Sequence, residues 1–283
     1  MIVFTTKPDS GASLKLHFQR FEFKYILQED LAAAIRRRIA EYVVPDPFAE
    51  HLPAGSYEVF SLYFDSPGFY YYWQKIDGIE RRKKVRLRTY RNTGNFEQYA
   101  FFELKRKHDA VILKDRFVMT KDDYKALIEN EDFSATEMRD QNRRNIVEEF
   151  EWERHMRSIS PKVLVAYVRE PYLGRYNQNF RVTFDSQIKA VENDNLFYAG
   201  NDWVDVSGNH MVMELKFTGV LPFYINRVIK EFNLERTTYS KYTNAVEACG
   251  SLAAGAPLQP AGLMQAKGEL ARWSTVEEGV FGV

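Results

Sequence analysis

Six short segments of the chain alternate apolar and charged residues, which is the period of two expected of β-strands. In three of them a glutamate is followed two positions later by a lysine, as in Glu22-x-Lys24. Each strand would therefore present one apolar face and one charged face. Several such strands curled together would gather their charges in a common polar interior. The segments are residues 21–25, 85–90, 102–107, 165–169, 181–185 and 212–217.

Six further segments carry the signals of helices. Between Gln28 and Val43, two acidic residues in the first turn precede an apolar stripe with a period near 3.6. Ser134 and Glu137 have the spacing of a capping box ahead of a highly charged helix. Helices in this number suffice to cover the apolar side of a curled sheet. The predicted helices span roughly residues 28–43, 68–75, 120–128, 134–157, 222–232 and 240–249.

These elements predict an α+β fold with a single large domain over residues 14–250. Beyond Gly250 the chain becomes rich in alanine, glycine and proline, which is typical of a linker. We therefore expect residues 251–283 to form a C-terminal tail that is partly helical or loosely ordered. One short helix is expected at residues 264–273.

Composition narrows the classes of function. The 39 lysines and arginines equal the 39 aspartates and glutamates, so the whole-chain charge predicts no general attraction to nucleic acid or membranes. The single cysteine, Cys249, suits a reducing compartment. We see no signal peptide and no apolar run of the roughly 20 residues that span a bilayer, so we expect a soluble, cytoplasmic protein. No glycine-rich phosphate loop, zinc spacing or Ser-His-Asp arrangement is present.

The charged strand faces have two explanations. A solvated face of an antiparallel sheet is the common one, and it suffices for any single strand. Taken together, however, the strands favour arginine, which binds phosphate through paired hydrogen bonds. A smaller set of carboxylates lies among the cations and could hold a divalent metal ion on a bound anion. These carboxylates are Glu22, Glu103, Asp185 and Glu214.

Nine segments of the chain, in this order, resemble the vacuolar transporter chaperone (VTC) domain, a branch of the triphosphate tunnel metalloenzymes in the CYTH-like superfamily. The resemblance covers roughly residues 16–248 and implies an antiparallel barrel of about eight strands, open as a tunnel with a charged lumen and braced by helices. The segments are FEFKYIL, SLYFDSP, RRKKVRLRTY, FFELKRK, LKDRF, LVAYVREPY, FRVTFD, VMELKF and YSKYTNA.

The resemblance implies roles for particular residues. The catalytic phosphate-binding cations would be Lys24, Arg86, Arg88, Lys105, Lys114, Arg169, Arg181 and Lys241. Tyr167, Ser240 and Lys216 would add phosphate contacts. Glu214 would hold Mn²⁺ or Mg²⁺, with Glu22 and Glu103 either as further metal ligands or as salt-bridge partners of neighbouring lysines. We interpret Asp65 as a turn or helix cap, and Tyr63, Tyr70, Tyr71 and Tyr72 as packing residues.

Two positions depart from the family pattern. Polymerase members carry a lysine where this chain has Thr238, although Arg236 lies close by. Hydrolase members carry a further glutamate where this chain has Arg20.

The expected function is a metal-dependent polyphosphate polymerase that transfers the γ-phosphate of ATP to a growing polyphosphate chain. The alternatives are a tripolyphosphatase with the same tunnel, or a module that only binds polyphosphate or nucleotide. The expected partners are ATP or another triphosphate and inorganic polyphosphate, without nucleic acid. A membrane protein that accepts the product is a further expected partner, and it would place the domain at the inner face of a membrane.

Overall fold

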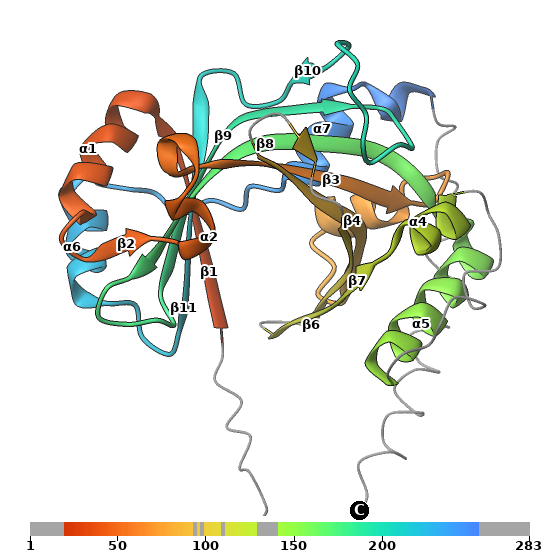
Figure 1. Cartoon of the computed structure of the whole chain (residues 1–283), viewed down its shortest axis with the longest axis horizontal. Helices are drawn as coiled ribbons and strands as arrows, with labels where there is room; N and C mark the ends of the chain where they lie inside the picture. Colours follow the sequence, from red (N-terminus) through yellow and green to blue (C-terminus); the bar gives the residue numbers. More distant parts are fainter. Residues whose placement is uncertain (1–19, 93–94, 97–98, 109–110, 129–140, 255–283) are drawn as a thin grey trace, which may run out of the picture.

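The computed structural model describes residues 20–92, 95–96, 99–108, 111–128 and 141–254 (Figure 1). In this part of the chain, eight long strands form one antiparallel sheet in the order β1-β11-β9-β8-β3-β4-β6-β7. They are β1 (Arg20–Gln28), β3 (Tyr57–Asp65), β4 (Arg82–Asn92), β6 (Ala100–His108), β7 (Val111–Met119), β8 (Ser160–Gly174), β9 (Arg181–Val191) and β11 (His210–Thr218). The short strands β2 (Val43–Pro45), β5 (Asn95–Phe96) and β10 (Val204–Asp205) pair with β8, β4 and β9.

Except for the short α2 (Pro47–Glu50), which was not predicted, the helices lie close to the predicted segments. They are α1 (Glu29–Ile39), α2 (Pro47–Glu50), α3 (Tyr70–Ile76), α4 (Lys121–Ile128), α5 (Gln141–Arg157), α6 (Phe223–Glu231) and α7 (Lys241–Ala248), with 3₁₀ turns at Pro53–Gly55 and Ser251–Ala254. The predicted capping box at residues 134–137 and the predicted tail helix at 264–273 lie outside the described residues. No helix in the described ranges is long and apolar enough to cross a membrane.

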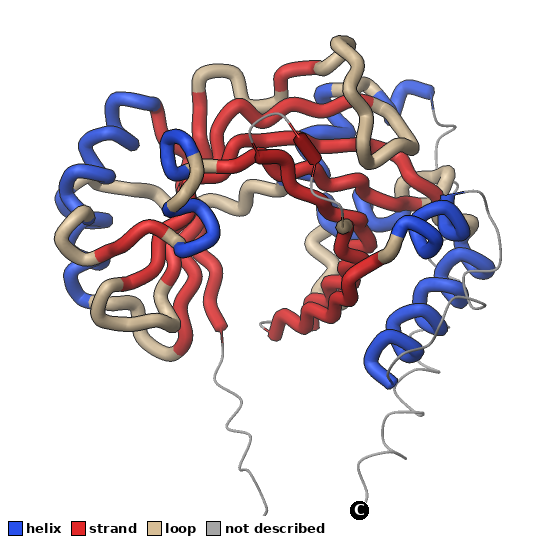
Figure 2. Tube along the Cα trace, in the orientation of Figure 1, coloured by secondary structure: helices blue, strands red, loops and turns tan. Residues whose placement is uncertain are grey.

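The sheet curls so strongly that its two ends approach one another (Figure 2). No ladder joins β1 to β7 within the described residues, so the sheet is a half-barrel with a seam between these edge strands. One contact crosses from β6 to β1, where the Lys105 ammonium lies 3.5 Å from the Glu22 carboxylate. The predicted antiparallel sheet of about eight strands with bracing helices is therefore confirmed. Within the described residues, no backbone pairing between β1 and β7 closes this sheet into a barrel.

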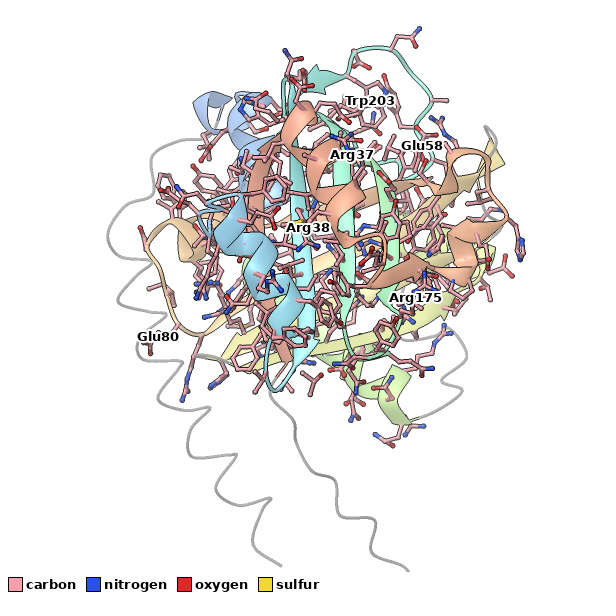
Figure 3. The ribbon with its side chains drawn as sticks, turned by 90° about the vertical axis from the view of Figure 1, so that its left-hand side faces the viewer. Arg37, Arg38, Glu58, Glu80, Arg175 and Trp203 are labelled. Atoms are coloured by element: carbon pink, nitrogen blue, oxygen red, sulfur yellow. The ribbon has the colours of Figure 1, made fainter. Side chains whose placement is uncertain are left out.

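The convex side of the sheet is apolar, as the alternation predicted. Below β3, β4, β6 and β7, residues such as Leu62 and Phe102 pack against Phe150 of α5. Below β1, β9 and β11, Phe184 packs with Ile35 of α1. Burying a side chain of this size contributes about 1.5–3 kcal/mol. In Figure 3 α1 faces the viewer and Arg38 lies between α1 and α6, where its guanidinium pairs with Glu231 at 3.0 Å.

The concave side combines an apolar floor with charged walls. Val59, Val165 and Val212 point inward and pack against Tyr242 of α7. This helix covers the floor at β8 and β9 and also contacts α3. Ser240 caps α7 by accepting a hydrogen bond from the Thr243 amide at 3.3 Å. The cap brings residues 240 and 241 to the edge of the floor, beside the charged strand faces.

Candidate functional site

The concave side encloses a pocket of about 440 Å³. The described residues that line it include twelve lysines and arginines and only two carboxylates. A hollow with this excess of positive charge suits an anion that carries several negative charges. Eleven of the predicted site residues line it, namely Glu22, Lys24, Arg86, Arg88, Lys105, Tyr167, Arg169, Glu214, Lys216, Ser240 and Lys241.

On one side of the pocket, charges face opposite charges across neighbouring strands. Lys24 of β1 lies opposite Glu214 of β11, and Glu22 lies opposite Lys216. Arg169 of β8 lies opposite Asp185 of β9. Opposite charges at directly paired positions stabilise a sheet. We call this side the paired wall, and its members are Glu22, Lys24, Arg169, Asp185, Glu214 and Lys216.

The contacts of the paired wall are short and shared. The Arg169 guanidinium donates two hydrogen bonds of 2.7 Å to the Asp185 carboxylate. The Lys241 ammonium lies 2.6 Å from Asp185 and 3.3 Å from Glu214. Lys216 approaches Glu214 to 2.8 Å and Lys24 approaches it to 3.5 Å. Asp185 and Glu214 thus hold four cations around one end of the pocket.

The surrounding cations control the ionisation of this wall. Burial alone would raise the pKa of Glu214, but Lys216, Lys241 and the other nearby cations hold that pKa well below its usual range. The pKa of Asp185 is likewise lowered, because Arg169 and Lys241 outweigh the cost of its burial. Both carboxylates are therefore ionised at neutral pH and are weak bases.

On the opposite side of the pocket, the buried carboxylate of Glu103 holds the cations of neighbouring strands in place. Its side chain is only 1% exposed and does not line the pocket. The carboxylate accepts a hydrogen bond of 2.6 Å from Arg86, pairs with Lys114, and lies 3.9 Å from Arg88. Arg86 also donates to the Tyr63 hydroxyl at 3.1 Å. The salt-bridge interpretation therefore fits Glu103 better than metal binding does.

Beyond Arg86, like charges face one another across the strands. Lys84 of β4 lies opposite Lys105 of β6, and Arg82 lies opposite Lys107. Lys105 in turn lies opposite Lys114 of β7. We call this side the like-charge wall, and its members are Arg82, Lys84, Lys105 and Lys107. Burial and the neighbouring cations lower the pKa of Lys84 well below its usual range, and they also lower that of Lys105.

Two predicted phosphate ligands lie outside the pocket wall. The guanidinium of Arg181 is 2.5 Å from the carboxylate of Asp46, which precedes α2. Lys114 pairs with Glu103, and its pKa falls to about 7, mainly because burial disfavours the charged form. Both residues lie on charged strand faces, as the alternation predicted, but each is engaged by a carboxylate.

The pocket is also lined by Lys84 and Lys75, which were not among the predicted site residues. Lys84 belongs to the same alternation as Arg86 and Arg88, so its signal was available in the sequence. Its ammonium donates to the Ser240 hydroxyl at 2.9 Å. Lys75 comes from α3, where no strand period could indicate it. Arg236 and Thr238 also line the wall, so the family departure at 238 faces the pocket.

Asp65 connects the elements around the floor. Its carboxylate accepts hydrogen bonds from the amides of Ser66, Tyr71 and Tyr72 at 2.7–3.0 Å, and from the Tyr242 hydroxyl. The predicted role as a helix cap is thus confirmed. Tyr63 does more than pack, because it lines the pocket and contacts Arg86.

A divalent cation would have few protein ligands here. No group of three or more His, Cys, Asp or Glu side chains suited to a metal ion occurs in the described residues. Glu22 and Glu214 both approach Lys24, at 3.1 and 3.5 Å, so these two carboxylates lie near one another. Mg²⁺ is commonly held by one or two carboxylates together with substrate phosphates. The pair fits that type of site and not an all-protein cage.

The family model described as the VTC domain matches residues 19–249, most of the chain. The chain belongs to the VTC-domain family. Together with the pocket, this membership makes the chain a triphosphate-tunnel domain that binds phosphate or nucleotide. No curated protein matched the chain significantly.

Two solved structures are similar to the VTC-domain chain. One is a Bacillus halodurans protein assigned as an adenylate cyclase, with a TM-score of 0.44 and 14% identity, covering 78% of this chain and 95% of its own. The other is a Pyrococcus horikoshii protein, with a TM-score of 0.43 and 13% identity, covering 81% of this chain and 98% of its own.

Proposed function

We propose that this VTC domain is a metal-dependent polyphosphate polymerase. In the reaction, a terminal oxygen of polyphosphate bonds to the γ-phosphorus of ATP, the bond to the β-phosphate oxygen breaks, and ADP leaves. The chain grows by one phosphoryl unit. The observation that supports this most directly is a pocket with twelve cations whose two lining carboxylates are already held by lysines.

The state of these carboxylates favours phosphate over water as the nucleophile. Attack by water gains from a general base whose pKa lies near the working pH. Lysines offset the effect of burial and lower the pKa of Glu22 far below that range, and the pKa of Glu214 is also lowered. A terminal phosphate is already ionised and needs no base. The arrangement therefore supports the polymerase over the triphosphatase.

The arginines would stabilise the charge that develops during transfer. Phosphoryl transfer depends mainly on positioning and on electrostatic stabilisation. Arg169 is held in place by Asp185, and Arg86 by Glu103. Arg88 approaches the hydroxyls of Ser61 and Tyr167 at 3.3 and 3.5 Å. Because these guanidiniums are fixed before the substrate binds, they need little reorganisation when the bond to the γ-phosphorus loosens.

Glu214 and Glu22 would hold the metal ion, with phosphate oxygens as its remaining ligands. Bound Mn²⁺ or Mg²⁺ would neutralise phosphate charge and align the phosphates. The lysines that now contact these carboxylates would turn to the substrate oxygens. Lys24 is suited to this exchange, because its ammonium already lies between Glu22 and Glu214.

The test is incubation of purified protein with γ-labelled ATP and either Mn²⁺ or Mg²⁺. Long labelled chains that a polyphosphate-specific hydrolase digests are expected. Labelled orthophosphate alone would overturn the proposal in favour of a triphosphatase, and binding without turnover would reduce the domain to a binding module. The Arg86→Ala variant serves as the blank, because it lacks one of the guanidiniums that the proposal requires.

A further inference from the structure

A second, smaller cavity lies on the convex side of the sheet. Its volume is about 160 Å³, and Phe60 of β3 forms part of its wall. Phe60 packs in the convex core, whereas its neighbour Val59 packs on the concave side, so the sheet separates this cavity from the central pocket. We call it the outer pocket, and its lining residues include Phe60, Arg91, Lys189, Tyr198, Gly200 and Trp203.

The register of the strands leaves room for this cavity. Phe60 of β3 lies opposite Ala166 of β8, and Ala166 lies opposite Lys189 of β9. A small alanine between two long side chains leaves a hollow in the convex face. Trp203, from the segment that follows β9, covers this hollow. Its ring lies 6.1 Å from the ring of Phe60, and the Lys189 ammonium lies 5.0 Å from its centre.

A hydrogen bond and a glycine hold the aromatic wall of the outer pocket. The Trp203 indole donates to the carbonyl of Gly200 at 2.8 Å, which folds the segment back on itself. A Cβ at Gly200 would collide with the Tyr198 ring, so this close approach to the backbone requires glycine. The rings of Tyr198 and Trp203 lie 5.8 Å apart. The wall therefore presents two aromatic rings in defined positions.

Lys189 brings a positive charge that the protein does not neutralise locally. Within the described residues, no carboxylate oxygen comes within 4.0 Å of its ammonium. Asp205 of β10 lies opposite Lys189. Its carboxylate instead accepts hydrogen bonds from the amides of Ser207 and Gly208, at 3.0 and 2.9 Å. The half-buried ammonium of Lys189 is therefore open to an anion from outside the chain.

The other carboxylates near the outer pocket are already engaged. Glu58 accepts two hydrogen bonds from Arg91, at 2.5 and 2.6 Å, and Asp202 accepts one from the Tyr198 hydroxyl. In Figure 3, Glu58 and Trp203 lie at the upper end of the molecule, where this cluster is located. Because each of these carboxylates has a donor of its own, neither compensates the charge of Lys189.

The size and chemistry of the outer pocket indicate its class of ligand. Pockets for drug-sized molecules measure about 300–1,000 Å³, so a cavity of about 160 Å³ suits a molecule with a single ring. Aromatic side chains pack favourably against another flat ring. The ammonium of Lys189 already lies over Trp203, so it would repel a cationic ligand and attract an anionic one.

We propose that the outer pocket binds a small anion that carries one aromatic ring, with its anionic group on Lys189 and its ring beside Tyr198 and Trp203. The inference is independent of the proposed function, because no residue lines both the outer and the central pocket. The domain can therefore hold this ligand and a triphosphate at the same time.

The test uses benzoate as the probe, on the full chain with tripolyphosphate added to fill the central pocket. Ligand-observed NMR titration gives the dissociation constant. Lys189→Met should weaken benzoate binding at least about tenfold, since one charge-assisted hydrogen bond contributes that much. Benzyl alcohol, which keeps the ring without the charge, should bind the unmodified protein more weakly by a similar factor. The matched control is Lys230→Met, an exposed lysine of α6, which should leave benzoate binding unchanged.

A second variant changes the shape of the outer pocket and keeps its charge. Gly200→Ala adds a methyl group where the Tyr198 ring lies, so the ring must move. Benzoate affinity should fall, whereas affinity for acetate, which has no ring, should stay within about twofold. Thermal unfolding confirms that both variants are folded.

Three outcomes would overturn the outer pocket as this ligand site. They are unchanged benzoate affinity in Lys189→Met, equal affinity of the unmodified protein for benzoate and acetate, and loss of benzoate binding when tripolyphosphate is added. Failure of the proposed function looks different. In that case labelled ATP yields no chains, while benzoate still binds and Lys189→Met still weakens it.

Discussion

The two walls of the pocket differ in which charges lie opposite one another on neighbouring strands. In the paired wall, every cation faces a carboxylate of a neighbouring strand, as Arg169 faces Asp185, although Lys216 also faces Arg181 on its other side. In the like-charge wall, lysine faces lysine, as Lys84 faces Lys105. The walls belong to one continuous sheet and both face the same pocket. The two charge patterns therefore occur within one domain, at different positions of the same sheet.

The difference indicates that one wall is complete without a ligand and the other is not. Ion pairs fix the side chains of the paired wall in the free protein, so this wall contributes to folding and presents a rigid surface. The like-charge wall is destabilised until an anion binds. Removal of a cation should therefore lower the stability of the free protein in the paired wall and raise it in the like-charge wall.

The largest effect is expected for Asp185→Ala. Asp185 is fully buried and contacts both Arg169 and Lys241. Removing one partner of a buried charge pair typically costs about 3–5 kcal/mol, because the remaining charges are left unpaired. The free energy of unfolding from urea titration measures the loss. Asp185→Asn is the comparison variant, because it keeps the shape and one acceptor oxygen but removes the charge. Equal stability of Asp185→Ala and the unmodified protein would contradict the role of this wall.

Arg86→Ala should abolish most turnover with little effect on folding. Removing one preorganised electrostatic group from an active site typically lowers the turnover number about 100- to 1,000-fold. Glu103 would still be held by Lys114, so its charge would not be stranded. Labelled-ATP assays measure the rate, and circular dichroism checks the fold. Arg116→Ala is the control, since that guanidinium lies over the Phe101 ring instead of in the pocket wall. Full activity of Arg86→Ala would rule out the assigned pocket.

Lys84→Met should stabilise the free protein while it weakens anion binding. Lys84 faces Lys105 and contacts no carboxylate in the described residues, so its removal relieves repulsion. One cross-strand pair is worth about 0.2–1 kcal/mol. In thermal unfolding without an anion, the midpoint temperature of Lys84→Met should be higher than that of the unmodified protein. Added tripolyphosphate should raise the midpoint of the variant by less than it raises that of the unmodified protein. In the paired wall, Glu214 and Glu22 outweigh the effect of burial and raise the pKa of Lys24. The Lys24→Met variant should therefore show the reverse sign in the free protein, and a rise in both variants would remove the contrast.

The last prediction concerns the dependence of stability on pH. The pKa of Lys114 falls to about 7 in the folded protein, and that of Lys84 is also lowered, whereas an unfolded lysine titrates near 10.4. Between about pH 7 and pH 9 the unfolded chain holds more protons at these sites, so the ligand-free protein should become more stable as pH rises. Urea titrations across this range measure the slope. The slope should decrease in Lys84→Met, and an unchanged slope would contradict the like-charge wall.

Strand alternation was sufficient to predict most of the pocket. A period of two assigns a face to each residue, which is why Lys24, Arg86 and Glu214 lie where the sequence indicated. The apolar residues between them form the convex core for the same reason. Likewise, the amphipathic stripes predicted α1 and α6 within a few residues.

The remaining features depend on contacts between distant parts of the chain. Arg181 lies on the predicted face but pairs with Asp46, 135 residues earlier. The buried Glu103 is paired with cations from both neighbouring strands, Arg86 of β4 and Lys114 of β7. Lys75 reaches the pocket from a helix, and the seam between β1 and β7 depends on how far the whole sheet curls. The alternation of residues within a single strand cannot predict any of these contacts.

The charge excess of the pocket also has a consequence for the outside of the molecule. The whole chain has as many acidic as basic side chains, while the pocket wall has ten more basic than acidic ones. The rest of the protein must therefore carry ten more acidic than basic side chains. A polyanion in solution therefore meets net negative charge outside the pocket and net positive charge within it, and this difference favours attachment at the pocket. Electrical neutrality thus gives this domain selectivity in where a polyanion can attach.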